Sequence, residues 1–196
     1  HASISGLIPK SQANKYPLNW VTCSDAQSLA TKVASGTSKT SSLMFGIQWD
    51  LVQKYIETKL ITQGSNLLTA QSLLKTNSTS WGNYQSTLYE LTNSNVKYSL
   101  NNGANWLTTI PFSKTSTSDK IFLTTGALTT FAKQNIFDFA GNVWEYTLEY
   151  SGNTASPCTI RGGAYESTAS ENNANTRTVA TTTFSYSSVG FRVSIY

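Results

Sequence analysis

The stretch that decides the fold is Phe137-Asp138-Phe139-Ala140-Gly141-Asn142-Val143-Trp144-Glu145-Tyr146. Two shorter stretches follow it along the chain, Arg161-Gly162-Gly163 and Val189-Gly190-Phe191-Arg192-Val193. In all three, glycines permit backbone turns that are closed to other residues. Large aromatic side chains stand beside those glycines, so we expect Trp144 and Phe191 in the core. Arg161 and Arg192 are expected to hold carbonyl or carboxylate oxygens inside a fold rich in loops.

Around these stretches the apolar runs are short, bounded by turn residues and rich in β-branched or aromatic side chains. This pattern is typical of strands, and it predicts them at 121–123, 143–148, 159–160 and 189–195. From residue 76 to 120 the chain is rich in Ser, Thr, Asn and Gly around isolated aromatics, which predicts long loops.

The N-terminal third carries the helical patterns. Ser24 and Gln27 have the spacing of a capping box, and apolar residues then recur at helical spacing up to Gly36. A second amphipathic helix is predicted from 47 to 60, and a weaker one from 66 to 75. The apolar stripe of the helix 47–60 consists of Leu51, Val52, Tyr55 and Ile56. Helices before strands, without βαβ alternation, predict an α+β fold with a small antiparallel sheet, and we expect residues 1–196 to form a single domain.

Composition argues against several classes of function. The net charge is +4, but the basic residues are scattered singly, which disfavours nucleic-acid binding. The apolar runs are far shorter than 18 residues, so no membrane span is expected. The single histidine, His1, argues against Ser-His-Asp, Cys-His and HExxH chemistry, and the chain lacks phosphate-binding glycine loops. We therefore expect no catalytic residue, metal or cofactor.

Three alternatives remain open at this level. Asp138 and Glu145 are candidate carboxylates for an unrecognised hydrolase, although a buried glutamate tied to backbone amides is the commoner arrangement. Asp138, Asn142 and a glutamate form a candidate calcium site, because hard oxygen ligands suit that ion. Cys23 and Cys158 either bridge in an oxidising compartment or lie buried as free thiols.

The three stretches resemble the DxAGNVWEW, RGGSW and GFR signature of the formylglycine-generating-enzyme/sulfatase-modifying-factor superfamily. The resemblance implies a C-type-lectin-like fold with two N-terminal helices, small antiparallel sheets and long loops. The sulfatase-activating members carry two reactive cysteines between RGG and GFR, where this chain has none. The histidine-rich iron site of ergothioneine-type relatives and the EPN, QPD and WND motifs of sugar-binding lectins are also missing from the sequence.

The resemblance therefore points to the non-catalytic branch, notably the variable proteins of diversity-generating retroelements. In those proteins the interval between RGG and GFR displays a hypervariable surface. Nearly every residue from 164 to 188 is of a type that AAY-derived codons yield, and we expect the exceptions Glu166, Glu171 and Arg177 to be fixed. A general lectin-like adhesin without programmed variation is the alternative.

We expect ligand-binding residues of this interval to form one solvent-facing patch, with Tyr186 as the anchor and Tyr165 packed inside. The candidates are Ala164, Ser167, Thr176, Thr178, Val179, Ala180, Tyr186, Ser187 and Ser188. The resemblance implies a protein or glycan receptor on a cell surface as the partner. It implies an extracellular, cell-surface or phage-virion location.

Overall fold

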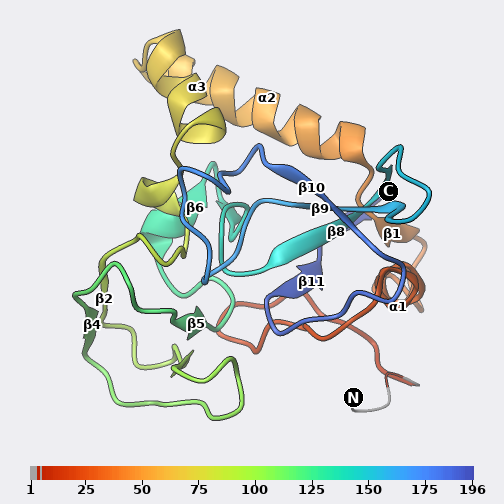
Figure 1. Ribbon diagram of the computed structural model, residues 1–196, viewed down its shortest axis with the longest axis horizontal. Coiled ribbons are helices and arrows are strands. Elements are labelled where there is room, and N and C mark those ends of the chain that lie inside the picture. Colours follow the sequence, from red (N-terminus) through yellow and green to blue (C-terminus); the bar gives the residue numbers. More distant parts are fainter. Residues whose placement is uncertain (1–3, 5) are drawn as a thin grey trace.

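Four strands from the C-terminal half form the central sheet (Figure 1). The structure is a computed structural model, and it describes residues 4 and 6–196. The strands lie in the order β10-β9-β8-β11. Their bounds are β8 Trp144–Tyr150, β9 Cys158–Arg161, β10 Arg177–Ala180 and β11 Val189–Phe191. The predicted strands at 143–148 and 159–160 are confirmed, whereas β10 was not foreseen.

One pair in this sheet is parallel. β9 runs antiparallel to both β8 and β10, but β11 pairs parallel to β8 with Val189 opposite Trp144. The expectation of antiparallel pairing is wrong for this pair. The reason is the connection: β10 runs in the same direction as β8, and the segment 181–188 then leads the chain back to the start of β8. That crossing segment becomes important for the candidate site.

The first helix, α1 (Cys23–Ala30), packs on one face of the sheet with Ala26 and Leu29 buried. Its N-cap is Thr22, whose hydroxyl accepts the N–H of Asp25 while the Asp25 carboxylate accepts the N–H of Thr22. The capping box predicted at Ser24 and Gln27 is therefore displaced by two residues. The helix also ends earlier than predicted, and turns lead from it to Gly36.

The second and third helices, α2 (Gly46–Thr62) and α3 (Leu67–Lys75), are confirmed. In Figure 1, α2 runs above the central sheet, on the side opposite β11, and α3 lies beside its C-terminal end. Trp49 and Gln53 of α2 are buried and both donate to the carbonyl oxygen of Ala174, at 3.0 and 2.8 Å. These contacts orient the helix so that Leu51 and Tyr55, assigned to the inward stripe, are exposed.

Short strand pairs complete the α+β architecture. The predicted strand 189–195 is divided at Arg192 into β11 and β12 (Val193–Ile195), and β12 pairs with β1 (Ser41–Leu43). The remaining pairs are β2 (Tyr89–Leu91) with β4 (Phe112–Lys114), β3 (Tyr98–Ser99) with β5 (Phe122–Leu123), and β6 (Ala132–Lys133) with β7 (Ile136–Phe137). Single 3₁₀ turns lie at Thr79–Trp81 and Thr129–Phe131. No helix among the described residues has the length and apolar character needed to cross a membrane.

Candidate functional site

Arg192 and Glu145 form a two-pronged ion pair that joins the third sequence motif to the first. Nε and Nη2 of Arg192 each donate to one carboxylate oxygen of Glu145 at 2.8 Å, and Nη2 also donates to the carbonyl oxygen of Phe137 at 3.0 Å. Burial raises the pKa of Glu145, and the charge of Arg192 offsets part of that effect. The glutamate is thus held by a guanidinium, not by the backbone amides that were expected.

Asp138, the other candidate carboxylate, is half-buried next to this pair. Its Oδ2 accepts the backbone N–H of Gly126 at 2.7 Å, and burial raises its pKa. Neither Asp138 nor Glu145 lines the two surface pockets described below. The geometry therefore gives no support to the hydrolase alternative.

The oxygen that Asn142 would offer to calcium already accepts two hydrogen bonds. Its Oδ1 lies 2.9 Å from Nδ2 of Asn83 and 3.3 Å from the backbone nitrogen of Leu123. Within residues 4 and 6–196, no group of three or more His, Cys, Asp or Glu residues is placed to hold a metal ion. Asn142 instead connects the first motif to the segment of Asn83 and to strand β5 in the interior.

Arg161 ties the central sheet to α2. Its side chain is buried, and its Nη2 and Nη1 lie 2.8 Å from Asp50 and 3.2 Å from Glu149. The same two carboxylates bind the half-exposed Arg177 at 3.1 and 2.6 Å. The guanidinium of Arg161 also lies 5.4 Å from the ring centroid of Trp49. The expectation that Arg161 and Arg192 hold carboxylates is confirmed for both residues.

The backbone after Arg161 has conformations that favour glycine. Gly162 and Gly163 have φ of +88° and +78°, and a Cβ on Gly163 would collide with the carbonyl oxygen of Asn172. Tyr165 is fully buried, stacks on Phe122 with ring centroids 4.8 Å apart, and donates its hydroxyl to Asn102. Burial raises the pKa of Tyr165 to about 12. Its predicted place inside the fold is confirmed.

The nine candidate binding residues do not form one exposed patch. Ala164, Ala180, Ser187 and Ser188 are buried; Ser167, Thr176 and Thr178 are half-buried; Val179 and Tyr186 are exposed. The expectation of exposure is wrong for the four buried residues. For the two serines the cause is visible, because Ser188 Oγ donates to Glu166 at 2.6 Å and Ser187 Oγ lies 3.3 Å from the Tyr165 hydroxyl. These contacts fasten the end of the interval to the interior.

Part of the set does converge on a surface pocket of about 360 Å³ between the sheet and the segment 181–188. Thr178, Val179, Ala180 and Ser188 line it, together with Trp144. Trp144 and Phe191 pack against the core but are only half-buried, so they are less buried than predicted. Trp144 packs against the core on one side and faces this pocket on the other.

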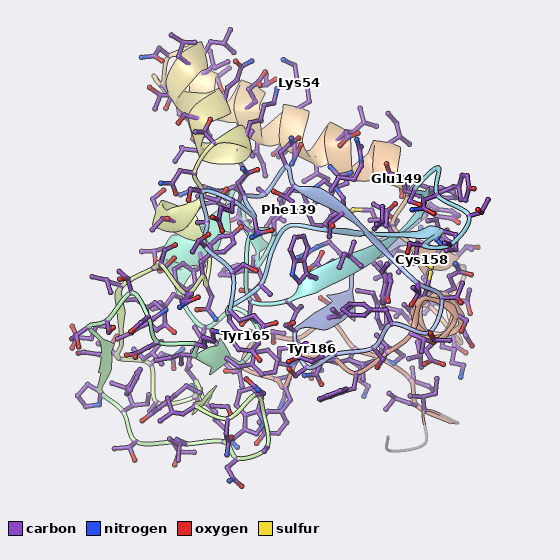
Figure 2. All side chains as sticks on the ribbon, viewed as in Figure 1. Lys54, Phe139, Glu149, Cys158, Tyr165 and Tyr186 are labelled. Atoms are coloured by element: carbon purple, nitrogen blue, oxygen red, sulfur yellow. The ribbon has the colours of Figure 1, made fainter. Side chains whose placement is uncertain are left out.

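Three exposed aromatic side chains form a row of neighbouring rings that begins at the pocket, and we call them the aromatic patch: Phe184, Tyr186 and Trp20. They are 39%, 42% and 45% exposed. The ring centroid of Tyr186 lies 5.7 Å from that of Trp20 and 6.5 Å from that of Phe184, which also lines the pocket. The backbone N–H of Trp20 donates to the carbonyl oxygen of Tyr186 at 3.1 Å. In Figure 2, Tyr186 lies below the central sheet, on the side away from α2.

Trp20 and Phe184 were missed at the level of sequence. Phe184 follows a run of threonines and stands two residues before Tyr186, so two aromatic residues close together near the end of the interval were a usable signal. Trp20 lies far away in sequence and precedes the first helix. No local pattern connects it to the interval, and only the folded chain brings it beside Tyr186.

A comparison with protein families matches residues 5–195 to the sulfatase-modifying factor enzyme 1-like domain. The chain belongs to this family. Two solved structures share its fold. CarF has a TM-score of 0.57 and 17% identity, covering 92% of this chain and 67% of CarF. Treponema denticola variable protein 1 has a TM-score of 0.51 and 14% identity, covering 91% of this chain and 70% of that protein. No match was found among curated protein sequences.

These similarities confirm the C-type-lectin-like fold and the resemblance to variable proteins. Cys23 begins α1 and Cys158 begins β9, so both lie outside the interval between RGG and GFR. Both are buried and unbridged.

Proposed function

We propose that this chain is a non-catalytic binding module that recognises a protein or glycan receptor through the aromatic patch and the adjoining pocket. The observation that carries the proposal is the grouping of Trp20, Phe184 and Tyr186 on the surface beside the pocket. Exposed aromatic side chains offer large contact areas with few rotatable bonds, and they dominate the binding energy of many interfaces.

The chemistry of the pocket favours an uncharged contact region on the ligand. Its lining side chains are all uncharged, with hydroxyl groups from Thr178 and Ser188 and apolar surface from Trp144 and Val179. Such a lining suits a hydroxyl-bearing or apolar group on the ligand, and a charged group would be desolvated there without a partner.

Non-catalysis is supported by the way the candidate acid–base groups are used. Both carboxylate oxygens of Glu145 accept hydrogen bonds from Arg192, and Asp138 accepts the N–H of Gly126. The interval that carries two reactive cysteines in the sulfatase-activating relatives has none here. The contacts of Glu145 and Asp138 thus belong to the scaffold on which the aromatic patch lies.

The second element of the proposal is programmed variation of the exposed part of the interval. A variable receptor-binding surface must face other cells, so we also propose an extracellular, cell-surface or virion location. The residues expected to be fixed have structural partners: Glu166 accepts from Ser188, Glu171 accepts from Thr168, and Arg177 pairs with Asp50. The codons for residues 164–188 should differ from a nearby template repeat at exposed positions such as Val179 and Tyr186. A gene without such a repeat would leave a lectin-like adhesin of constant sequence.

Receptor binding is tested on arrays of glycans and of purified cell-surface proteins. We expect Tyr186→Ala and Phe184→Ala to weaken the wild-type signal at least about tenfold, because each removes an aromatic anchor. The matched control is Leu68→Ala on α3, whose side chain is 79% exposed and lies outside the patch. Binding that survives both aromatic substitutions would refute the proposal.

A further inference from the structure

The two cysteines of the chain meet in the fold although they are far apart in sequence. Cys23 lies at the start of α1 and Cys158 at the start of β9, in the same buried cluster. The thiol of Cys158 neighbours that of Cys23 in this cluster, and Gln27 Nε2 lies 3.6 Å from Cys23 Sγ. Figure 2 shows Cys158 at the end of the sheet nearest α1.

The thiol pair can be reached from solvent through a second surface pocket. This pocket has a volume of about 410 Å³, and both cysteines contribute to its wall together with Gln27, Glu149 and Thr182. A small oxidant can therefore approach sulfur atoms that are otherwise buried. The described residues provide no third His, Cys, Asp or Glu in a metal-binding group with them, so a closed zinc site is not available.

We propose that Cys23 and Cys158 are a modification site, at which a small disulfide oxidant converts the two thiols into an intramolecular disulfide. In the reaction the two thiols lose two protons and two electrons, and one sulfur–sulfur bond forms. The oxidant, a disulfide such as oxidised glutathione, accepts both electrons and both protons and is released as two thiols. This inference is independent of the receptor and goes beyond the binding function.

The position of the bond links it to the aromatic patch. Trp20 lies three residues before Cys23, and Cys158 pairs with Ala180, the last residue of β10 before the segment 181–188. A disulfide would therefore join the helix that follows Trp20 to the strand paired with the end of β10, and Trp20 and the segment 181–188 are already connected by the hydrogen bond from the N–H of Trp20 to Tyr186. Oxidation should fix the relative positions of Trp20 and the segment 181–188.

The rate of oxidation should depend on pH. Burial, together with the neighbouring thiol, raises the pKa of Cys23 to about 12. Only the thiolate attacks a disulfide, so attack by Cys23 is slow at neutral pH and accelerates as the pH rises. The incubation is therefore extended, or carried out at a pH of about 8.5, where a larger fraction of the thiol is ionised.

The test compares the folded chain after incubation with oxidised glutathione and after reduction. The oxidised form should be about 2 Da lighter, resist maleimide labelling after denaturation, and melt roughly 5–15 °C higher. Exchange of the Trp20 amide hydrogen should slow by about tenfold, which reports on the patch itself. Cys23→Ala and Cys158→Ala, each lacking one partner, should show none of these changes on oxidation.

The wild-type chain alone can overturn the proposal, even where a variant fails to fold. Two thiols that remain reactive after prolonged oxidation, or two separate glutathione adducts, would show that the bond does not form. A disulfide that forms but leaves exchange at Trp20 unchanged would overturn the link to the patch. Neither result would bear on receptor binding, which the arrays test separately.

Discussion

The sequence motifs and the interval between them have opposite roles in this molecule. The motifs contain the charged residues Arg161, Glu145 and Arg192, and each of them forms ion pairs inside the fold. The interval from 164 to 188 consists mostly of Ala, Ser, Thr and Asn, yet it contributes Phe184 and Tyr186 to the exposed aromatic patch. The charged residues of the family motifs therefore hold the scaffold together, whereas the aromatic patch, which we propose binds a ligand, comes from residues outside the motifs.

The interval itself is divided in the same way. Ala164, Ser187 and Ser188 at its two ends are buried against the motifs, whereas Val179 and Tyr186 face solvent. Variation without loss of stability is possible only at the second kind of position, because exposed substitutions usually change the free energy of unfolding by less than about 0.5 kcal/mol. Four predictions test this division, and they are ordered by the size of the expected effect.

The largest effect is expected from Arg192→Ala. The substitution leaves the buried carboxylate of Glu145 without its guanidinium, and a buried charge that loses its partner costs about 3–5 kcal/mol. Urea unfolding measures the change in the free energy of unfolding. The control is Arg177→Ala, whose half-exposed side chain lies within the interval and should contribute at most about 1 kcal/mol. Equal and small losses for both variants would contradict the scaffold role of Arg192.

Gly163→Ala should cost about 2–4 kcal/mol, since it combines an unfavourable φ with a collision. The φ of Gly163 is +78°, and the new methyl group would meet the Asn172 carbonyl oxygen and a Tyr84 ring carbon 2.7 Å away. Gly152→Ala is the matched control, because Gly152 has φ of +82° but open space around its Cβ position. Thermal and urea unfolding of the two variants separate the collision from the backbone strain. A Gly163 variant no less stable than the Gly152 variant would show that the turn can relax.

Enlarging two residues of the interval should separate its buried part from its exposed part. Ala164→Leu inserts a larger side chain into a fully buried position, where overpacking costs about 1–3 kcal/mol. Val179→Leu adds one methylene on the exposed strand β10 and should change the free energy of unfolding by less than about 0.5 kcal/mol. Urea unfolding of both variants provides the comparison. Similar values for the two would mean that burial does not limit variation in this interval.

Much of the fold could be predicted because its elements depend on local patterns. Helical spacing located α2 and α3, and apolar runs between turn residues located β5, β8 and β9. The orientation of α2 could not be predicted. Leu51 and Tyr55 are more apolar than Gln53, but the carbonyl oxygen of Ala174 takes hydrogen bonds from Trp49 and Gln53 and so turns that face inward.

The candidate site was predicted only in part for a related reason. Tyr186 was found, since a large amphipathic side chain stands out among small ones. The burial of Ser187 and Ser188 depends on hydrogen bonds to Tyr165 and Glu166. The place of Trp20 depends on a contact across most of the chain, and the parallel pairing of β11 depends on where the crossing segment ends. Such long-range contacts leave no periodic trace in the sequence.

The smallest effect concerns the charge of Asp138 in the first motif. Burial raises the pKa of Asp138, while the Gly126 N–H and the charge of Arg192 lower it. Because its pKa is higher in the folded chain than in the unfolded chain, the stability that Asp138 contributes is fully present below the unfolded pKa of about 3.9. That contribution is lost as the pH rises through the folded pKa. Asn can keep the positive φ of Asp138 and accept the Gly126 N–H without titrating.

We therefore expect the stability of Asp138→Asn relative to wild type to increase as the pH rises from about 4 to 7, by less than about 1 kcal/mol in total. Urea unfolding of both proteins across this pH range measures the difference. The pKa of Glu145 is also raised by burial, but Glu145 is present in both proteins and largely cancels. A relative stability that falls as the pH rises would mean that the ionised Asp138 stabilises Arg192. Asp138 would then belong with Glu145 among the charges that hold the scaffold together.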